Sequence, residues 1–126
     1  MARHLLDSDI LIWVLRGKKE AVDFVRGLLK EEIPAISALA FYELWSGARA
    51  AEEAAISTFL SSFDVCPVDP EIATRGGGYY RVYRKKGITL SVSDALIAAT
   101  ARTRGLVLVT QNARHFPMID IEKRSL

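Results

Sequence analysis

Apolar and polar residues follow one another along the chain in short blocks that predict alternating strands and helices. Leu5-Leu6 is an apolar run that ends at Asp7, and the apolar pattern resumes at Ile10. This pattern predicts a short buried strand followed directly by a helix. Leu106–Val109 is the clearest strand in the chain, because four apolar residues follow one another without interruption.

Between these two strands, apolar residues recur at three- and four-residue spacings, as on one face of a helix. The predicted helices cover Ala21–Leu29, Ser37–Gly47, Ile56–Phe63, Asp69–Lys86 and Ser91–Ala101, and further short strands are predicted at Ile33–Ile36, Asp64–Val68 and Ile119–Ile121. Strands that alternate with helices indicate a parallel sheet with right-handed crossovers. We therefore expect a single α/β domain over residues 1–126, with three α/β/α layers and a mostly parallel sheet of four or five strands.

One of these helices carries contradictory signals. Asp69-Pro70 is a good helix start and Gly87 a good stop. Gly76–Gly78 lies between them, and each glycine costs a helix about 1 kcal/mol relative to alanine. The triplet is compatible with a kink, with a break in the helix or with close packing of another backbone.

Composition narrows the possible classes of protein only slightly. A chain of 126 residues with a net charge of +2 is large enough for one core, and its charge permits an anionic partner without requiring one. Cys66 is the single cysteine, which excludes an internal disulfide and suits a reducing compartment. No apolar run approaches the about 20 residues that span a bilayer, and no signal peptide is recognisable, so we expect a cytoplasmic protein.

Four polar residues can be brought to one edge of the predicted sheet. Asp7 and Asn112 follow the first and last clear strands, and function in open parallel sheets gathers at the carboxyl ends of strands. Glu43 and Asp94 are acids within helices that are otherwise apolar or rich in small residues. Each acid also has a purely structural explanation: Asp7 as a helix N-cap, Glu43 as a surface residue, and Asp94 as part of a capping box with Ser91.

Clustered carboxylates would suit a divalent metal ion. Mg²⁺ and Mn²⁺ prefer oxygen ligands, and metal-assisted phosphodiester hydrolysis uses the cation to polarise the phosphate and activate water. Acids crowded together without a cation repel one another and resist ionisation. Carboxylates at one sheet edge therefore predict a metal-dependent hydrolase.

Four segments in the same order resemble the motifs of the PIN-domain ribonucleases, and within them of the VapC toxins of toxin–antitoxin pairs. The segments are Leu5–Ile12, Ser37–Gly47 with Tyr42-Glu43-Leu44 at its centre, Ser93–Ala101 and Val109–Phe116. Each motif alone is weak, but together they span nearly the whole chain. The resemblance implies a metal-dependent endoribonuclease.

The resemblance also implies a role for each candidate site residue. Asp7 and Asp94 would be the principal ligands of Mg²⁺, for which Mn²⁺ can substitute. Glu43 would hold or activate a metal-bound water, and Thr110 would order the site through its hydroxyl. Asn112 stands where many family members carry a fourth acid, which argues against a second tightly held metal in the free protein.

Other polar residues lie near these motifs or elsewhere in the chain. Asp9 stands where the family often has Asn, and it either restores one negative charge or is a solvated helix residue. His4 and His115 have no partner visible in the sequence, so we leave both out of the site. The best candidates for an RNA-binding surface are Arg81, Arg84 and Lys85, which interleave with Tyr79, Tyr80 and Tyr83. The structural alternative is that the tyrosines cover the core while the cations favour a helix C-terminus.

The resemblance further implies partners: an RNA substrate, a VapB-like antitoxin and a second copy of the chain in a homodimer, with no membrane. We expect Trp13 or Trp45 at or near the antitoxin groove, because they are an excess of large apolar residues for so thin a domain. Alternatives are a stand-alone RNA-processing PIN nuclease, a non-catalytic module that binds RNA or protein, and a haloacid-dehalogenase-like phosphatase. In the last class too, the first strand ends in Asp-x-Asp, as in Asp7-Ser8-Asp9.

Overall fold

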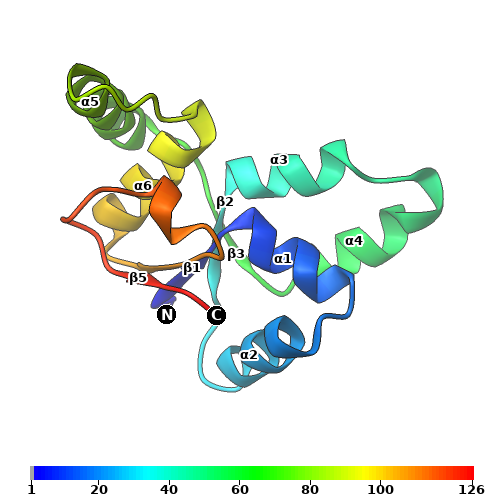
Figure 1. The fold of residues 1–126 in the computed structure, drawn as a ribbon. Coiled ribbons are helices and arrows are strands. Elements are labelled where there is room, and N and C mark those ends of the chain that lie inside the picture. The colour runs from blue at the N-terminus through cyan, green and yellow to red at the C-terminus, as the bar shows by residue number, and fades with distance from the viewer. Residues whose placement is uncertain (1) are drawn as a thin grey trace.

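The computed structural model describes residues 2–126, which form a central sheet with helices on both faces (Figure 1). The elements are β1 (His4–Leu6), α1 (Ser8–Leu15), α2 (Lys19–Leu29), β2 (Ala35–Ser37), α3 (Ala38–Ser46), the 3-10 helix η1 (Ala50–Glu52), α4 (Glu53–Leu60), β3 (Asp64–Cys66), α5 (Pro70–Lys85), α6 (Val92–Arg104), β4 (Val107–Val109), the 3-10 helix η2 (Ala113–His115) and β5 (Lys123–Arg124).

The sheet has five strands in the order β3-β2-β1-β4-β5, and every pair is parallel. This confirms the predicted three-layer α/β/α architecture. The chain builds outward from β1 through β2 and β3, then crosses back to add β4 and β5 on the other side. β1 therefore lies at the point where the strand order reverses, which is where open α/β sheets form their binding crevices.

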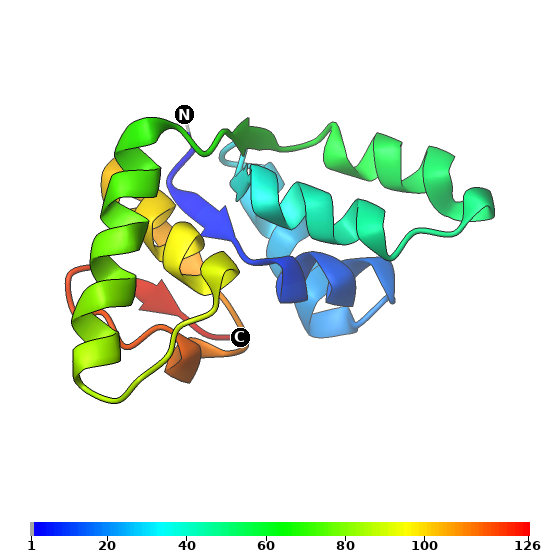
Figure 2. The ribbon, with the colours of Figure 1, turned by 90° about the horizontal axis from the view of Figure 1, so that it is seen from above.

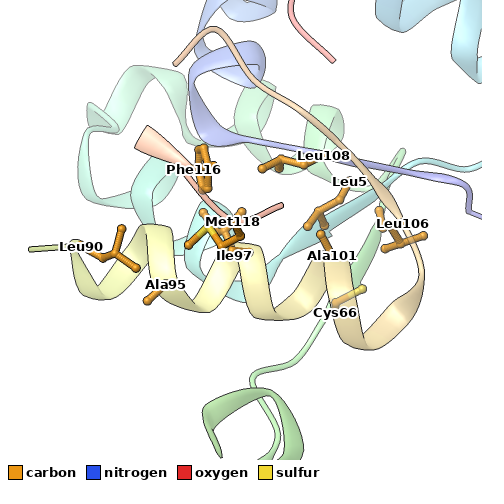
Figure 3. Close-up of a cluster of buried hydrophobic side chains, with 12 residues drawn as sticks. Leu5, Cys66, Leu90, Ala95, Ile97, Ala101, Leu106, Leu108, Phe116 and Met118 are labelled. Atoms are coloured by element: carbon orange, nitrogen blue, oxygen red, sulfur yellow. The ribbon is translucent and has the colours of Figure 1, made fainter. Parts of the chain in front are cut away.

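Successive residues of β1 and β4 face opposite layers, as strand geometry requires. Leu5 and Leu108 belong to the core cluster on the α6 side, where Figure 3 shows them beside Ile97. The next residues along the two strands, Leu6 and Val109, belong to the second cluster, beneath α1, α2, α3 and α4. Figure 2 shows α5 and α6 on one side of β1 and α1, α2, α3 and α4 on the opposite side.

The helix starts follow the capping signals in the sequence. The side chains of Ser37, Asp69 and Ser91 cap α3, α5 and α6, accepting hydrogen bonds from backbone N–H groups of the first turn. Pro70 occupies the first turn of α5, and Gly87 just beyond the helix has a φ of +80°. Local side-chain chemistry therefore sets where these helices begin and end.

α5 runs unbroken through Gly76–Gly78, which excludes a break in the helix, and Gly76 packs closely against α6. A Cβ on Gly76 would lie 2.8 Å from Leu96 Cδ2 and 3.5 Å from the Ala95 carbonyl oxygen, which shows how closely α5 approaches α6. Nothing in the structure explains Gly77 and Gly78.

The strand predicted at Ile119–Ile121 is wrong, because the last strand is Lys123–Arg124. Ile119 is 97% exposed, so its apolar character does not reflect burial. The intervening Asp120 accepts a hydrogen bond from Tyr79 Oη at 2.8 Å, which ties this loop to α5 instead. No helix within residues 2–126 is long and apolar enough to span a bilayer.

Candidate functional site

Asp7 leaves β1 at its carboxyl end and is both a helix cap and the centre of a polar cluster. Its Oδ1 accepts a hydrogen bond from Ser8 N at 2.8 Å, which caps α1, and its Oδ2 accepts one from Thr110 Oγ1 at 2.8 Å. The side chain is held in place by the sheet, since Asp7 N donates to the Val109 carbonyl at 2.9 Å. Asp7 is 7% exposed, so a carboxylate is fixed at the switch point of the sheet.

Glu43 reaches the same place from α3. Its Oε2 accepts a hydrogen bond from Ser8 Oγ at 3.2 Å, and its Oε1 accepts one from Ser93 Oγ at 3.0 Å. Ser8 follows Asp7 and Ser93 precedes Asp94, so the two hydroxyls link the three acids. The structure therefore brings Asp7, Glu43 and Asp94 together at this edge of the sheet.

Asp94 lies in the first turn of α6, where its backbone N–H donates to Ser91 Oγ at 3.0 Å. Burial raises the pKa of Asp94, and the Glu43 and Asp9 carboxylates add to the rise, while Ser91 and His115 oppose it. His115 Nδ1 lies 3.9 Å from Asp94 Oδ2. His115 thus borders the site, which the sequence did not reveal.

Asp9 holds the loop after β4, and is not a solvated helix residue. Its Oδ2 accepts hydrogen bonds from Gln111 N at 2.9 Å and Asn112 Nδ2 at 3.0 Å, and Thr110 Oγ1 lies 3.3 Å away. Its Oδ1 is buried without a hydrogen-bond partner within residues 2–126. Asp9 therefore brings a negative charge beside the neutral Asn112 and presents one free oxygen.

The crowding of these acids has a measurable electrostatic consequence. Burial, followed by repulsion from Asp9, raises the pKa of Asp7 from 3.8 to about 6, although Thr110 and Ser8 donate hydrogen bonds that favour the charged form. Asp94 repels Asp7 as well. A cation bound among Asp7, Asp9 and Asp94 would oppose this mutual repulsion and favour the ionised form of Asp7.

The hydroxyl network and the His4 partner were not foreseen from the sequence. Ser8 and Ser93 each neighbour a candidate acid, which is the only local signal that they support the site. His4 Nδ1 lies 2.6 Å from Glu32 Oε1, but this pair sits at the start of β1, away from the cluster. The partner of His4 is therefore an acid outside the cluster.

The tyrosines of α5 follow the structural alternative. Tyr79, Tyr80 and Tyr83 are half-buried and pack against the core, and Tyr83 Oη donates to the Pro117 carbonyl at 3.3 Å. Arg81, Arg84 and Lys85 are exposed, and Arg84 lies over the Tyr80 ring at 5.4 Å. Among the described hydrogen bonds and ion pairs, none joins these cations to the carboxylates.

A cavity of about 400 Å³ adjoins the cluster on the Glu43 side. We call it the α3 groove; it is lined by Ile12, Leu15, Arg16, Glu43, Leu44, Gly47, Arg49, Glu52 and Ile56. Neither tryptophan lines it. Trp45 is half-buried and packs against the core beside Phe41, with ring centroids 6.4 Å apart, and Trp13 lies under Lys18 Nζ at 4.1 Å.

Comparison with known proteins agrees with this geometry. Residues 4–121 match the PIN domain family. Ribonuclease VapC10 of Mycobacterium tuberculosis is 41% identical over 116 residues, covering 92% of this chain and 87% of that protein. The tRNA(fMet)-specific endonuclease VapC of Shigella flexneri is 32% identical over 124 residues, covering 94% of this chain and 93% of its own.

Solved structures share the fold. The DNA-bound VapBC from Salmonella typhimurium superposes with a TM-score of 0.86 at 29% identity, covering 99% of this chain and 98% of that chain. A toxin–antitoxin complex from Klebsiella pneumoniae superposes with a TM-score of 0.80 at 30% identity, covering 92% of each chain. The chain belongs to the PIN-domain family and, within it, to the VapC ribonucleases.

The raised pKa of Asp7 predicts a pH-dependent stability in the absence of divalent ions. Because the folded pKa of about 6 exceeds 3.8, the folded protein binds the proton more tightly, and stability falls as pH rises between these values. The loss amounts to roughly 3 kcal/mol above pH 6. Asp7→Asn removes the ionisation, and Thr110 can redirect its hydroxyl to Asp9. In EDTA, this variant should melt at a higher temperature than wild type, and the difference in melting temperature should grow from pH 4 to pH 7.

The matched control is Asp64→Asn, which removes an exposed acid from β3. Its melting temperature should follow that of wild type across the same pH range. A constant difference between Asp7→Asn and wild type would show that Asp7 does not titrate in this window.

The Asp9 contacts predict a difference between two substitutions. Asp9→Ala leaves Gln111 N and Asn112 Nδ2 without their acceptor, which should cost about 1–3 kcal/mol of unfolding free energy in urea titrations. Asp9→Asn keeps an acceptor oxygen for these donors and should lose less. Hydrogen exchange of the Gln111 amide should be fast in Asp9→Ala and slow in wild type and Asp9→Asn. Equal protection in all three would contradict the contact.

Proposed function

We propose that the protein is a Mg²⁺-dependent endoribonuclease that hydrolyses RNA phosphodiester bonds and is the toxin of a type II toxin–antitoxin pair. The observation that carries the proposal is the convergence of Asp7, Glu43 and Asp94 at the carboxyl end of β1, joined through Ser8 and Ser93. The names of the relatives support ribonuclease chemistry.

The donor set fits a hard divalent cation. Every candidate ligand is an oxygen, and the Asp9 Oδ1 is buried without a partner within residues 2–126. Burial, together with repulsion from Asp9 and Asp94, raises the pKa of Asp7. Within the same residues, no three or more acidic, histidine or cysteine side chains form a ready-made metal-binding group. Asp7 and Asp94 would therefore hold Mg²⁺, or Mn²⁺, together with several waters, which is a common arrangement for Mg²⁺.

When bound, the cation would polarise the scissile phosphate and assist attack by water. The chain's own residues would orient the reactants. Glu43, whose two oxygens are fixed by serine hydroxyls, would position the attacking water. Thr110 holds the Asp7 carboxylate in place, and Asp9 orients the Asn112 amide through its Nδ2.

The α3 groove supports an antitoxin as the second partner. Its lining includes Glu43, other charged residues, and apolar residues such as Ile12 and Leu15. An apolar segment with a basic side chain would fill such a groove, and the cation would reach Glu43. The likeness to solved toxin–antitoxin complexes supports this assignment. The name of the tRNA(fMet)-specific endonuclease supports an RNA substrate. A homodimer stays our expectation from the family resemblance. Arg81, Arg84 and Lys85 stay our candidates for the outer path of the RNA.

A haloacid-dehalogenase-like phosphatase is not favoured. Residues 4–121 match the PIN domain family instead, and Asp9 Oδ2 accepts hydrogen bonds from the loop at 110–112. A phosphatase would hydrolyse aryl phosphates, which a ribonuclease of this kind should leave intact.

Asp7→Asn and Asp94→Asn should each abolish cleavage of single-stranded RNA in Mg²⁺, because each removes a proposed metal ligand. Glu43→Gln should reduce kcat by about 10² to 10⁴. Asp64→Asn, the same change at an exposed site, should cleave at the wild-type rate. In calorimetric titrations, Mn²⁺ should bind wild type at one specific site and fail to bind Asp94→Asn. Full activity of either ligand variant would refute the mechanism.

The groove assignment is tested by a pair of matched leucines. Leu15 lines the α3 groove and Leu29 lies in α2, and both are 42% exposed. Leu15→Glu should weaken binding of the antitoxin encoded beside this gene at least about tenfold, the cost of burying an unpaired charge, whereas Leu29→Glu should bind like wild type. Equal binding by both variants would place the antitoxin elsewhere. If no neighbouring gene product binds, a stand-alone RNA-processing nuclease becomes the better explanation.

A further inference from the structure

A second cavity, of about 320 Å³, borders the carboxylates on the side opposite the α3 groove. We call it the Asp94 pocket; it is formed by the loop between α5 and α6 and by η2, and its walls include Ile88, Leu90, Asp94, Arg114, His115 and Pro117. We propose that this pocket binds the nucleotide next to the scissile phosphate. The proposal rests on the ribonuclease function proposed above and names a subsite of its substrate.

The pocket lies directly beside the carboxylate cluster. It shares Asp94 with the carboxylate cluster, while the α3 groove shares Glu43. An RNA strand continues on both sides of the bond that is cut, so a nuclease must accommodate at least one flanking nucleotide. A nucleotide bound in the Asp94 pocket would place its phosphate beside Asp94, which is a proposed ligand of the cation.

The walls of the pocket carry groups that can bind the parts of a nucleotide. Arg114 is exposed and has no ion pair or hydrogen bond among the side-chain contacts of residues 2–126, so its guanidinium is available for a phosphate. Ile88, which is 42% exposed, and Pro117 offer apolar surface. The His115 ring lies at the border with Asp94 and presents a face on which a base can stack.

The size of the pocket agrees with one nucleotide. Its volume lies at the lower end of the range of about 300–1,000 Å³ that small-molecule sites occupy. A peptide helix would need a longer groove.

The walls are held in place before any ligand binds. Tyr83 Oη donates to the Pro117 carbonyl at 3.3 Å, and His115 N donates to the Asn112 carbonyl at 2.8 Å. Ser91, at the end of the loop between α5 and α6, caps α6 by accepting a hydrogen bond from Asp94 N. A pocket whose backbone is fixed in this way loses little conformational entropy on binding.

Arg114 and the cations of α5 differ in their surroundings. Arg114 lines a cavity that contains a site carboxylate, whereas Arg84 lies over the Tyr80 ring. Arg114 should therefore contribute more to RNA binding than any single cation of α5.

The test measures binding of a short fluorescent single-stranded RNA by anisotropy in EDTA, where no divalent ion supports cleavage. Arg114→Gln should raise the Kd about tenfold and reduce the salt dependence of log Kd by about 0.7, the value for one lost phosphate contact. The control Arg26→Gln makes the same change at an exposed site on α2 and should bind like wild type.

A second pair of variants tests the apolar wall. Ile88→Glu places a carboxylate in the pocket and should weaken binding, whereas Ile119→Glu makes the same change at a residue that is 97% exposed and outside the pocket. A nucleoside monophosphate should compete with the RNA at lower concentration than inorganic phosphate does. In Mg²⁺, Arg114→Gln should raise KM and leave kcat near the wild-type value.

The outcomes are distinguishable. If wild type binds and cleaves RNA but both pocket variants bind as tightly as their controls, the subsite is refuted and the ribonuclease function stands. If inorganic phosphate competes as well as the nucleotide, the pocket holds only an anion and the proposal fails. If wild type neither binds nor cleaves RNA, the ribonuclease function fails and the subsite fails with it. Circular dichroism melts of all four variants confirm that each is folded.

Discussion

The parallel pairing of β1 with β4 is the constraint on which the site depends. Leu6 pairs with Val109, and the Asp7 backbone N–H then donates to the Val109 carbonyl, which brings Asp7 and Thr110 side by side. A slip of one residue in this register would turn Leu5 and Leu6 toward the wrong layers. Because the two layers of the core fix the register, the same apolar contacts that fold the protein also align its acids.

The acids are brought together at an electrostatic cost that serves the proposed chemistry. Asp7 is buried beside Asp9 and Asp94, and its raised pKa shows that the folded structure opposes its ionisation. Hydrogen bonds from Ser8 and Thr110 offset only part of this opposition. A fold that retains an unfavourable cluster of charge at its switch point is arranged to gain from a cation, and the Ser8 and Ser93 hydroxyls keep Glu43 within the same cluster.

The sequence predicts the fold well because the fold is largely encoded in local patterns. Short apolar runs mark the strands, and capping residues such as Ser37 and Ser91 mark the helix starts. A residue can serve both a structural and a functional purpose. One carboxylate oxygen of Asp7 caps α1, and the other accepts a hydrogen bond from Thr110 in the candidate site. The false strand at Ile119–Ile121 arose because apolar alternation also occurs in this loop, where Ile119 is exposed and Ile121 packs against the core.

The features that the sequence does not predict are contacts between distant segments. Gly76 is explained only by the approach of Leu96, and His115 belongs to the site only because η2 lies beside α6. The contact of Asp9 with the loop after β4 spans 103 residues between Asp9 and Asn112, and no pattern within either segment indicates it. Such contacts follow from the packing of whole elements, which periodicity and capping do not specify.

Asp9 and Asn112 pair an acid with a neutral amide, and their hydrogen bond explains why the two residue types suit their positions. Asp9 Oδ2 is approached by donors from Gln111 N and Asn112 Nδ2, so the position is suited to a carboxylate. A second carboxylate at position 112 would remove one donor and add repulsion to a cluster in which the pKa of Asp7 is already raised. An amide at 112 supplies the donor and keeps an oxygen of its own. The pair thus places its acid where a backbone N–H and an amide donor meet it, and its amide where a second acid would add repulsion.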